Sequence, residues 1–267
     1  MNLAQHVIIG QYVPGDSPVY RLDPRAKLWG IVFLVAVVFL ANNAASYAFL
    51  IGFTLFSIVL SRVPLRFMWN GLKPILILIV FTTILHLWFT KGGSVVVDFG
   101  GLVIYEEGLR QAVFIALRLL TIILLTSLLT LTTSPLQLTD GLERVLSPLK
   151  GIGVPVHDLA LMMSIALRFI PTLLEETDKI IKAQMSRGAN FDSGPIWQRI
   201  KNLIPVLIPL FISAFRRAED LATAMEARGY RGGEGRTKLR ALQYTRRDLV
   251  LGVVLFCLLV GLLLLRN

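Results

Sequence analysis

Long apolar runs separated by short polar segments dominate the chain. A helix needs about 20 mainly apolar residues, each rising about 1.5 Å, to cross about 30 Å of hydrocarbon. The runs that meet or approach this length are residues 28–41, 44–60, 72–89, 113–131 and 249–265. The pattern therefore predicts an all-α, polytopic membrane protein with about five transmembrane helices and long cytoplasmic helices between the fourth and fifth.

The stretch 132–247 differs from the rest, since it holds 17 of the 27 basic residues and 11 of the 17 acidic ones. Proline and glycine divide it into three predicted helices, over 135–149, 156–187 and 195–228. The apolar halves of the two long helices, 159–174 and 203–215, are short and interrupted by Arg or Pro. We expect them to lie at the membrane base without spanning it, with their charged halves in water.

Basic residues near membrane ends are retained in the cytoplasm, and they predict the orientation. They precede the first run and separate the second from the third, at Arg21, Arg25, Lys27, Arg62, Arg66 and Lys73. We therefore predict a cytoplasmic N-terminus and an external β-hairpin near 94–105. The predicted domains are an N-terminal bundle of four spans (1–131), a cytoplasmic coupling-helix region (132–247) and a C-terminal span (248–267).

Composition agrees with a membrane class, because 55% of residues are hydrophobic, 16% are charged and the mean hydropathy is +0.68. The net charge of +10 is carried largely beside the apolar runs, so we expect contact with lipid and no nucleic acid. The single Cys257 and three scattered histidines predict no metal site. Arg118, inside the fourth run, either faces the bundle or snorkels outward.

A repeat joins the two long helices at their ends. Residues 183–188 read Ala-Gln-Met-Ser-Arg-Gly and residues 224–229 read Ala-Met-Glu-Ala-Arg-Gly, an offset of 41. A helix ending in a small residue, Arg and Gly carries a cation at its negative end, and Gly supplies a left-handed residue that stops the helix. An ordinary helix cap explains one such end, but two in register favour docking of each arginine on a partner.

The candidate docking residues are those of the two tips, Ser186, Arg187, Gly188, Ala227, Arg228 and Gly229. Residues before them approximate a supporting helical face at Asp178, Ile180, Ala183, Glu219, Leu221 and Ala224.

Several motifs together resemble the transmembrane T component of energy-coupling factor transporters, the EcfT/CbiQ family. They are Tyr-Arg-Leu-Asp-Pro-Arg-Ala-Lys at 20–27, Asp-Gly-Leu-Glu at 140–143 with the linker 146–155, Leu-Arg-Phe-Ile-Pro at 167–171, and the two tips. The tips are similar to the family's Ala-Arg-Gly motifs, with Ser186 in place of Ala in the first. The resemblance covers essentially the whole chain.

The resemblance implies a non-catalytic scaffold in the cell membrane. Two cytoplasmic ABC-type ATPases, EcfA and EcfA′ in the family, would each receive one tip through Arg187 or Arg228. A separate S component would bind the vitamin or other micronutrient. This chain would bind no cofactor, because ATP and Mg would belong to the ATPases; in agreement, the sequence has no G-x-x-x-x-G-K-[ST] phosphate loop.

Two other functions remain open at the level of sequence. A permease subunit that binds solute itself would require paired broken spans near the membrane midplane. An intramembrane enzyme would require convergent His, Asp or Ser residues in the spans, and the sequence has no such set.

Overall fold

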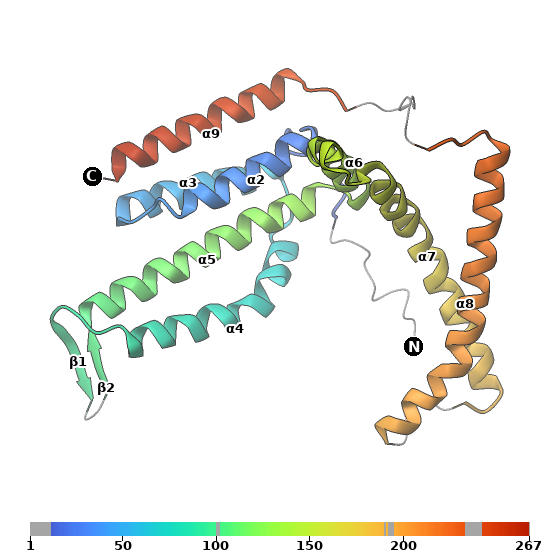
Figure 1. Cartoon of the computed structure of the whole chain (residues 1–267). Coiled ribbons are helices and arrows are strands. Elements are labelled where there is room, and N and C mark those ends of the chain that lie inside the picture. The colour runs from blue at the N-terminus through green and yellow to red at the C-terminus, as the bar shows by residue number, and fades with distance from the viewer. Residues whose placement is uncertain (1–11, 100–101, 190, 192–194, 233–241, 267) are drawn as a thin grey trace. The chain divides into compact units, whose positions relative to one another are not determined.

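The computed structural model describes residues 12–99, 102–189, 191, 195–232 and 242–266. Its elements are, in order, α2 (Pro24–Val38), α3 (Ala44–Ser61), α4 (Leu65–Phe89), β1 (Val95–Phe99), β2 (Leu102–Tyr105), α5 (Glu106–Thr132), α6 (Pro135–Val145), the 3₁₀ helix η1 (Ser147–Ile152), α7 (Val156–Ser186), α8 (Ile196–Ala227) and α9 (Arg246–Leu265) (Figure 1). The predicted all-α class is confirmed, and the predicted hairpin forms as an antiparallel pair, β1 with β2.

The chain forms two compact units. The bundle unit comprises residues 10–142 and 242–267, and the helix-pair unit comprises 143–241. The division falls within α6, because the first half of this helix packs on the start of α2. A Cβ on Gly141 would lie 3.1 Å from Leu28 Cδ1 and 3.2 Å from Pro24 Cβ, so any side chain there would require these neighbours to shift.

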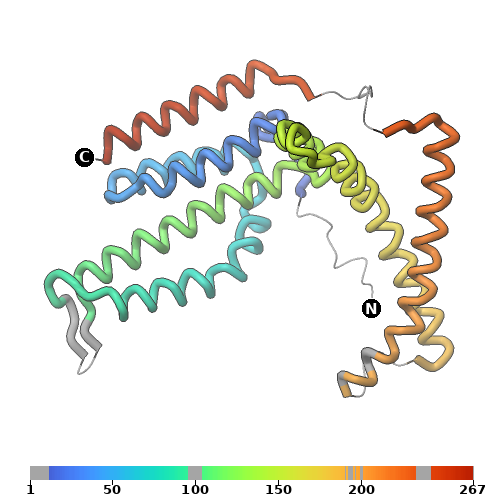
Figure 2. The backbone as a smooth tube through the Cα atoms, viewed as in Figure 1, coloured from blue at the N-terminus to red at the C-terminus, as the bar shows by residue number. Residues whose placement is uncertain are grey.

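In the bundle unit, α5 packs against α2, α3 and α4, while α9 packs against α2 and α3 (Figures 1 and 2). The core between these helices is apolar and includes Val38, Tyr47, Leu50, Leu125 and Leu262, all nearly or fully buried. Many large apolar side chains on the outer faces are exposed, as expected for helices that face lipid.

Five described helices are long and apolar enough to cross a membrane: α3, α4, α5, α7 and α9. The number of candidate spans agrees with the prediction, but one of the five helices is not the one that was predicted. Helix α2 has 15 residues, about 22 Å, and is too short by itself, although the chain continues as a tight turn through Ala41. Helix α7 qualifies instead, because it continues without a break through Pro171 for 31 residues. The prediction that its apolar half is too short was therefore wrong.

The local signals at the helix ends explain several boundaries. Asp23 caps α2, since its Oδ1 accepts a hydrogen bond from the Arg25 backbone N–H at 2.8 Å, and Pro24 occupies the first helical position. The third predicted span, 72–89, lies within the longer helix α4, which begins at Leu65 directly after its N-cap residue Pro64 and passes through Pro74. The predicted long helices 156–187 and 195–228 agree with α7 and α8 to within one residue at each end.

Arg118 faces the interior of the bundle unit. Its Nε donates to Tyr47 Oη at 3.1 Å, its Nη2 donates to the Ala41 carbonyl at 3.4 Å, and its guanidinium lies 5.2 Å from the centre of the Phe39 ring. Of the two placements predicted from sequence, the structure has the one that pairs the charge inside the bundle, which lowers the cost of a cation in a span.

Candidate functional site

The two tips have the same backbone structure. At the end of α7, the Gly188 N–H donates to the Met185 carbonyl and the Ala189 N–H donates to the Gln184 carbonyl, both at 3.0 Å. At the end of α8, the Gly229 N–H donates to the Glu226 carbonyl at 2.8 Å and the Tyr230 N–H to the Met225 carbonyl at 3.0 Å. These pairs define a Schellman motif at each end, with the arginine as the cap residue.

Glycine is required at both tips, as the sequence predicted. Gly188 has φ +91° and Gly229 has φ +73°, the left-handed region that L side chains rarely adopt. A Cβ at either position would meet no atom within 4 Å, so backbone conformation selects glycine here, without any steric contact.

The two cap arginines are exposed. Within the described part of the chain, neither the Arg187 nor the Arg228 side chain forms a hydrogen bond or a salt bridge. Ser186 and Ala227, which precede them, are small and exposed as well. Each tip therefore presents an accessible guanidinium on a fixed backbone, which suits bidentate binding to a carboxylate.

The structure shows where the residues of the predicted supporting face lie on their helices. At about 100° per residue, Ile180 lies about 200° around α7 from Asp178, so these two cannot share a face. On α8, Leu221 is half-buried against α7, whereas Glu219 and Ala224 are exposed. Ala183 is exposed on α7, so the accessible surface near the tips includes Ala183, Glu219 and Ala224 but not Leu221.

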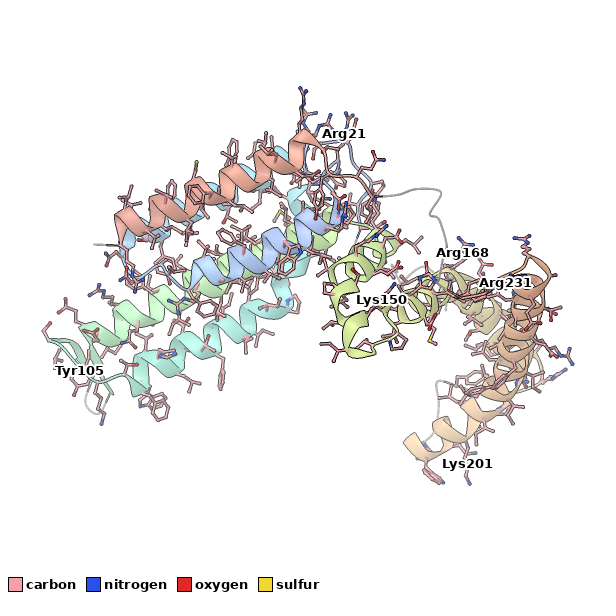
Figure 3. All side chains as sticks on the ribbon, turned by 45° about the horizontal axis from the view of Figure 1, so that its top comes forward. Arg21, Tyr105, Lys150, Arg168, Lys201 and Arg231 are labelled. Atoms are coloured by element: carbon pink, nitrogen blue, oxygen red, sulfur yellow. The ribbon has the colours of Figure 1, made fainter. Side chains whose placement is uncertain are left out.

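Helices α7 and α8 pack antiparallel, and this relationship places the tips at opposite ends of the pair. The Gln184 side chain donates to the Pro205 carbonyl at 3.3 Å, and Glu176 binds Ser213 and Arg217, the latter at 2.8 Å. Further along, residues from both helices, Phe169 and Leu221 among them, line a shared apolar groove. Lys201 and Arg231 lie toward the two ends of α8 in Figure 3.

The register gives the distance between the two arginines along the pair. Because Gln184 is level with Pro205 and Glu176 with Ser213, Arg187 is level with about residue 202 of α8. Some 26 residues of α8 then separate that level from Arg228, or roughly 40 Å at 1.5 Å per residue. Two arginines this far apart and on opposite ends cannot enter one small pocket, so each needs its own docking site.

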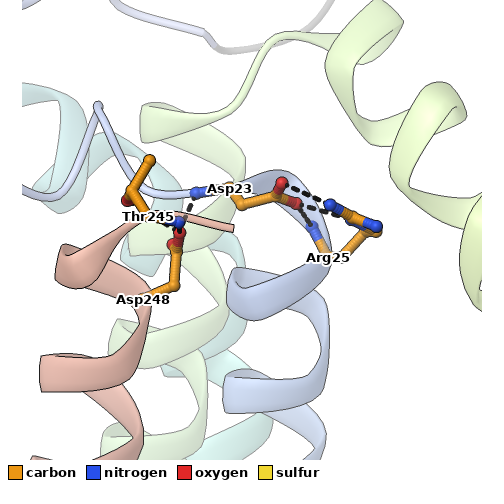
Figure 4. A network of polar contacts seen from close by, with 4 residues as sticks. All are labelled: Asp23, Arg25, Thr245 and Asp248. Atoms are coloured by element: carbon orange, nitrogen blue, oxygen red, sulfur yellow. Dashed lines mark hydrogen bonds and ion pairs between the residues drawn. The ribbon is translucent and has the colours of Figure 1, made fainter. Parts of the chain in front are cut away.

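A second polar cluster joins the starts of α2 and α9 in the bundle unit (Figure 4). Asp248 Oδ1 accepts a hydrogen bond from the Asp23 backbone N–H at 2.8 Å, while its Oδ2 accepts from the Thr245 backbone N–H and hydroxyl at 2.7 and 2.8 Å. Arg25 forms a salt bridge with Asp23 at 2.9 Å. The motif at 20–27 therefore has a structural role, connecting the first helix to the last.

Lys27 completes this connection toward α5. Its Nζ donates to the Thr132 carbonyl at 2.9 Å, the Thr133 hydroxyl at 3.2 Å and the Tyr20 carbonyl at 3.4 Å, and only 6% of the residue is exposed. Burial lowers the pKa of the Lys27 ammonium to about 8. Sequence reasoning did not predict the roles of Lys27 and Asp248, although Thr245-x-x-Asp248 is a recognisable capping box.

Within the described residues, no group of three or more His, Cys, Asp or Glu side chains is placed to hold a metal ion. His157 contacts Glu143, with 3.0 Å between Nδ1 and Oε1, and Cys257 is a free, exposed thiol.

The five long apolar helices define the chain as a multi-pass α-helical membrane protein. The family model of CbiQ, a cobalt transport protein, matches residues 15–239. The energy-coupling factor transporter transmembrane protein EcfT of Brevibacillus brevis is 62% identical over 252 residues, 94% of this chain and 95% of that protein. The EcfT proteins of Bacillus subtilis and Exiguobacterium sibiricum are 56% and 54% identical, covering 94% and 97% of this chain and 98% and 97% of their own lengths.

The chain therefore belongs to the EcfT/CbiQ family and is a transmembrane component of an energy-coupling factor transporter. The resemblance found from the motifs is confirmed.

Proposed function

We propose that this chain is a coupling scaffold that transmits ATP-driven motion from two cytoplasmic ATPase subunits to a substrate-binding S component. Arg187 docks on one ATPase and Arg228 on the other. ATP binding closes the ATPase pair, which changes the distance between the two docked tips and moves α7 and α8 against each other. This motion drives the S component to release a vitamin or other micronutrient. ATP hydrolysis then reopens the ATPase pair and returns α7 and α8 to their starting positions.

The observation that carries this proposal is the matched pair of exposed, Schellman-capped arginines at opposite ends of one antiparallel helix pair. Their separation of roughly 40 Å suits two subunits of a dimer. The different residues at the tips, Ser186 in one and Ala227 in the other, favour two non-identical ATPases.

The proposal places the helix pair in the cytoplasm, although α7 is apolar enough to span. Antiparallel packing puts the apolar half of α7, around Ile165 and Phe169, level with the charged half of α8. That half contains Arg216, Arg217, Glu219 and Asp220. If α7 crossed the membrane, these charges would lie in hydrocarbon. The free-energy cost of insertion would be about 2.5 to 3.5 kcal/mol for each Arg or Asp near the membrane centre. Positive charge beside the first spans likewise supports a cytoplasmic N-terminus.

The test is co-expression of this chain with its ATPases and an S component. Arg187→Ala combined with Arg228→Ala should release both ATPases during purification and abolish ATP-driven uptake, while each single variant should release mainly one. Arg231→Ala and Arg168→Ala are matched controls, because both arginines are exposed in the same unit but lie outside the caps. Retention of both ATPases and normal uptake in the double variant would contradict the proposal.

A further inference from the structure

The bundle unit contains an apolar slot that the coupling role does not use. It has a volume of about 280 Å³ and lies among α2, α3, α5 and α9. Its walls are apolar, with Leu34, Phe53, Leu125 and Val254 at its inner end. This volume far exceeds the roughly 10–15 Å³ that one water molecule requires, and walls of this kind offer water few hydrogen-bond partners.

One end of the slot, here called its mouth, lies where α2 and α9 begin and α3 and α5 end. Residues at the mouth are Lys27, Leu60, Thr132 and Arg247, together with Pro18, Val19 and Leu22 from the segment before α2. All four helices line the slot over about two turns from there, which gives a depth of roughly 10 Å. That depth fits within the roughly 15 Å of hydrocarbon in one leaflet.

The mouth of the slot is basic. Arg247 lines it, and Arg62 lies two residues after Leu60, which also lines it. Both arginines are exposed, and neither forms a salt bridge or a side-chain hydrogen bond with any described residue. The nearby Asp16 accepts two hydrogen bonds of 2.7 Å from Arg21, and its negative charge also attracts Arg62 and Arg247, which places both arginines near one anion.

Arg62 also has an unusual backbone. It caps α3 in the left-handed conformation, with φ +55° and ψ +24°, and it is the only described residue other than glycine with positive φ. Glycine or asparagine adopts this conformation at lower cost. A residue other than glycine in this conformation costs about 1–3 kcal/mol, which motivates a functional hypothesis for Arg62 beside the slot.

We propose that this slot binds one acyl chain of an anionic phospholipid, with the phosphate held by Arg62 and Arg247. Apolar walls and a cationic mouth match the two parts of such a lipid, and basic pockets between membrane helices bind anionic head groups. The bound lipid would fill the space between α9 and the other helices of the bundle unit. This site is independent of ATPase docking, since it involves neither tip.

The experiment compares lipids retained by the full-length chain. The protein is equilibrated in detergent micelles with equal amounts of phosphatidylglycerol and phosphatidylcholine, and bound lipid is quantified by native mass spectrometry. The wild-type chain should retain phosphatidylglycerol in excess. Arg62→Gln combined with Arg247→Gln should reduce this excess about 10- to 30-fold. Each cation near a membrane surface strengthens the binding of anionic lipid by about tenfold or less.

Arg66→Gln combined with Lys73→Gln is the matched control, since it removes the same charge near the same helices but outside the slot. It should leave the excess unchanged. Ser57→Phe should abolish retention by filling the slot, and glycerol phosphate, which lacks acyl chains, should not displace the lipid. The proposal would be overturned if the two double variants lost equal amounts of phosphatidylglycerol. It would also be overturned if the wild-type chain retained the two lipids in the same ratio as the micelle, or if glycerol phosphate alone displaced the lipid.

Discussion

Asp248 accepts a hydrogen bond from the backbone N–H of Asp23, 2.8 Å away and 225 positions apart in the sequence. One carboxylate thereby caps the last helix through Thr245 and holds the start of the first. The contact is buried, so the bond is protected from competing water. It connects the C-terminal span to helices of the bundle unit that all come before residue 146.

Removing this carboxylate should destabilise the bundle unit. Asp248→Ala leaves the buried Asp23 N–H without a partner and removes the cap of α9, at a combined cost of about 2–4 kcal/mol. The expected result is a lower midpoint of thermal unfolding in detergent. Asp220→Ala, at an exposed position in α8, is the control and should change the midpoint little. Equal midpoints for the two variants would show that the contact contributes nothing.

Arg118 and Tyr47 should be energetically coupled. Their hydrogen bond lies between α5 and α3, inside the bundle unit. We expect a double-mutant cycle with Arg118→Leu and Tyr47→Phe to give a coupling free energy of about 0.5–1.5 kcal/mol, the range found for polar contacts between membrane helices. Unfolding of the four proteins in mixed micelles measures it, and strictly additive effects would contradict the contact.

The glycines at the tips should matter for docking but not for the bundle. Gly188→Ala or Gly229→Ala forces a left-handed alanine, at about 1–2 kcal/mol, so the cap rearranges and the arginine turns away. ATPase retention should fall for the affected tip, while the thermal midpoint of the bundle should stay constant.

Gly151→Ala is the control for the tips, because Gly151 lies in η1, has no positive φ and no atom within 4 Å of an added Cβ. It should retain both ATPases. If either tip variant retained them as fully as Gly151→Ala, the cap geometry would be irrelevant to docking.

Gly141 should not tolerate a side chain. A Cβ there would lie 3.1 Å from Leu28 and 3.2 Å from Pro24, so Gly141→Val should separate α6 from α2 and cost about 1–3 kcal/mol. Gly52→Ala, in α3 with open space around it, should be neutral or slightly stabilising, since alanine favours a helix. Melting curves of the two variants compare the sites directly, and a valine variant as stable as wild type would refute the close packing.

Much of the fold was predictable because its signals are local. Apolar length predicted the spans α3, α4, α5 and α9, Asp23 and Pro24 predicted the start of α2, and Arg-Gly predicted both tips. The error concerned the apolar half of α7, which was predicted to be too short to span, although the helix 156–187 itself was predicted correctly.

The sequence by itself determined the class of protein, the helices and the two capped arginines, because each depends on composition or on neighbours within one helical turn. Only the tertiary structure decided that α7 and α8 run antiparallel with their tips far apart, that Arg118 faces Tyr47, that Asp248 holds Asp23, and that a slot with a basic mouth lies among four helices. These features arise from contacts between residues distant in the chain, whose pairing depends on how complete helices pack.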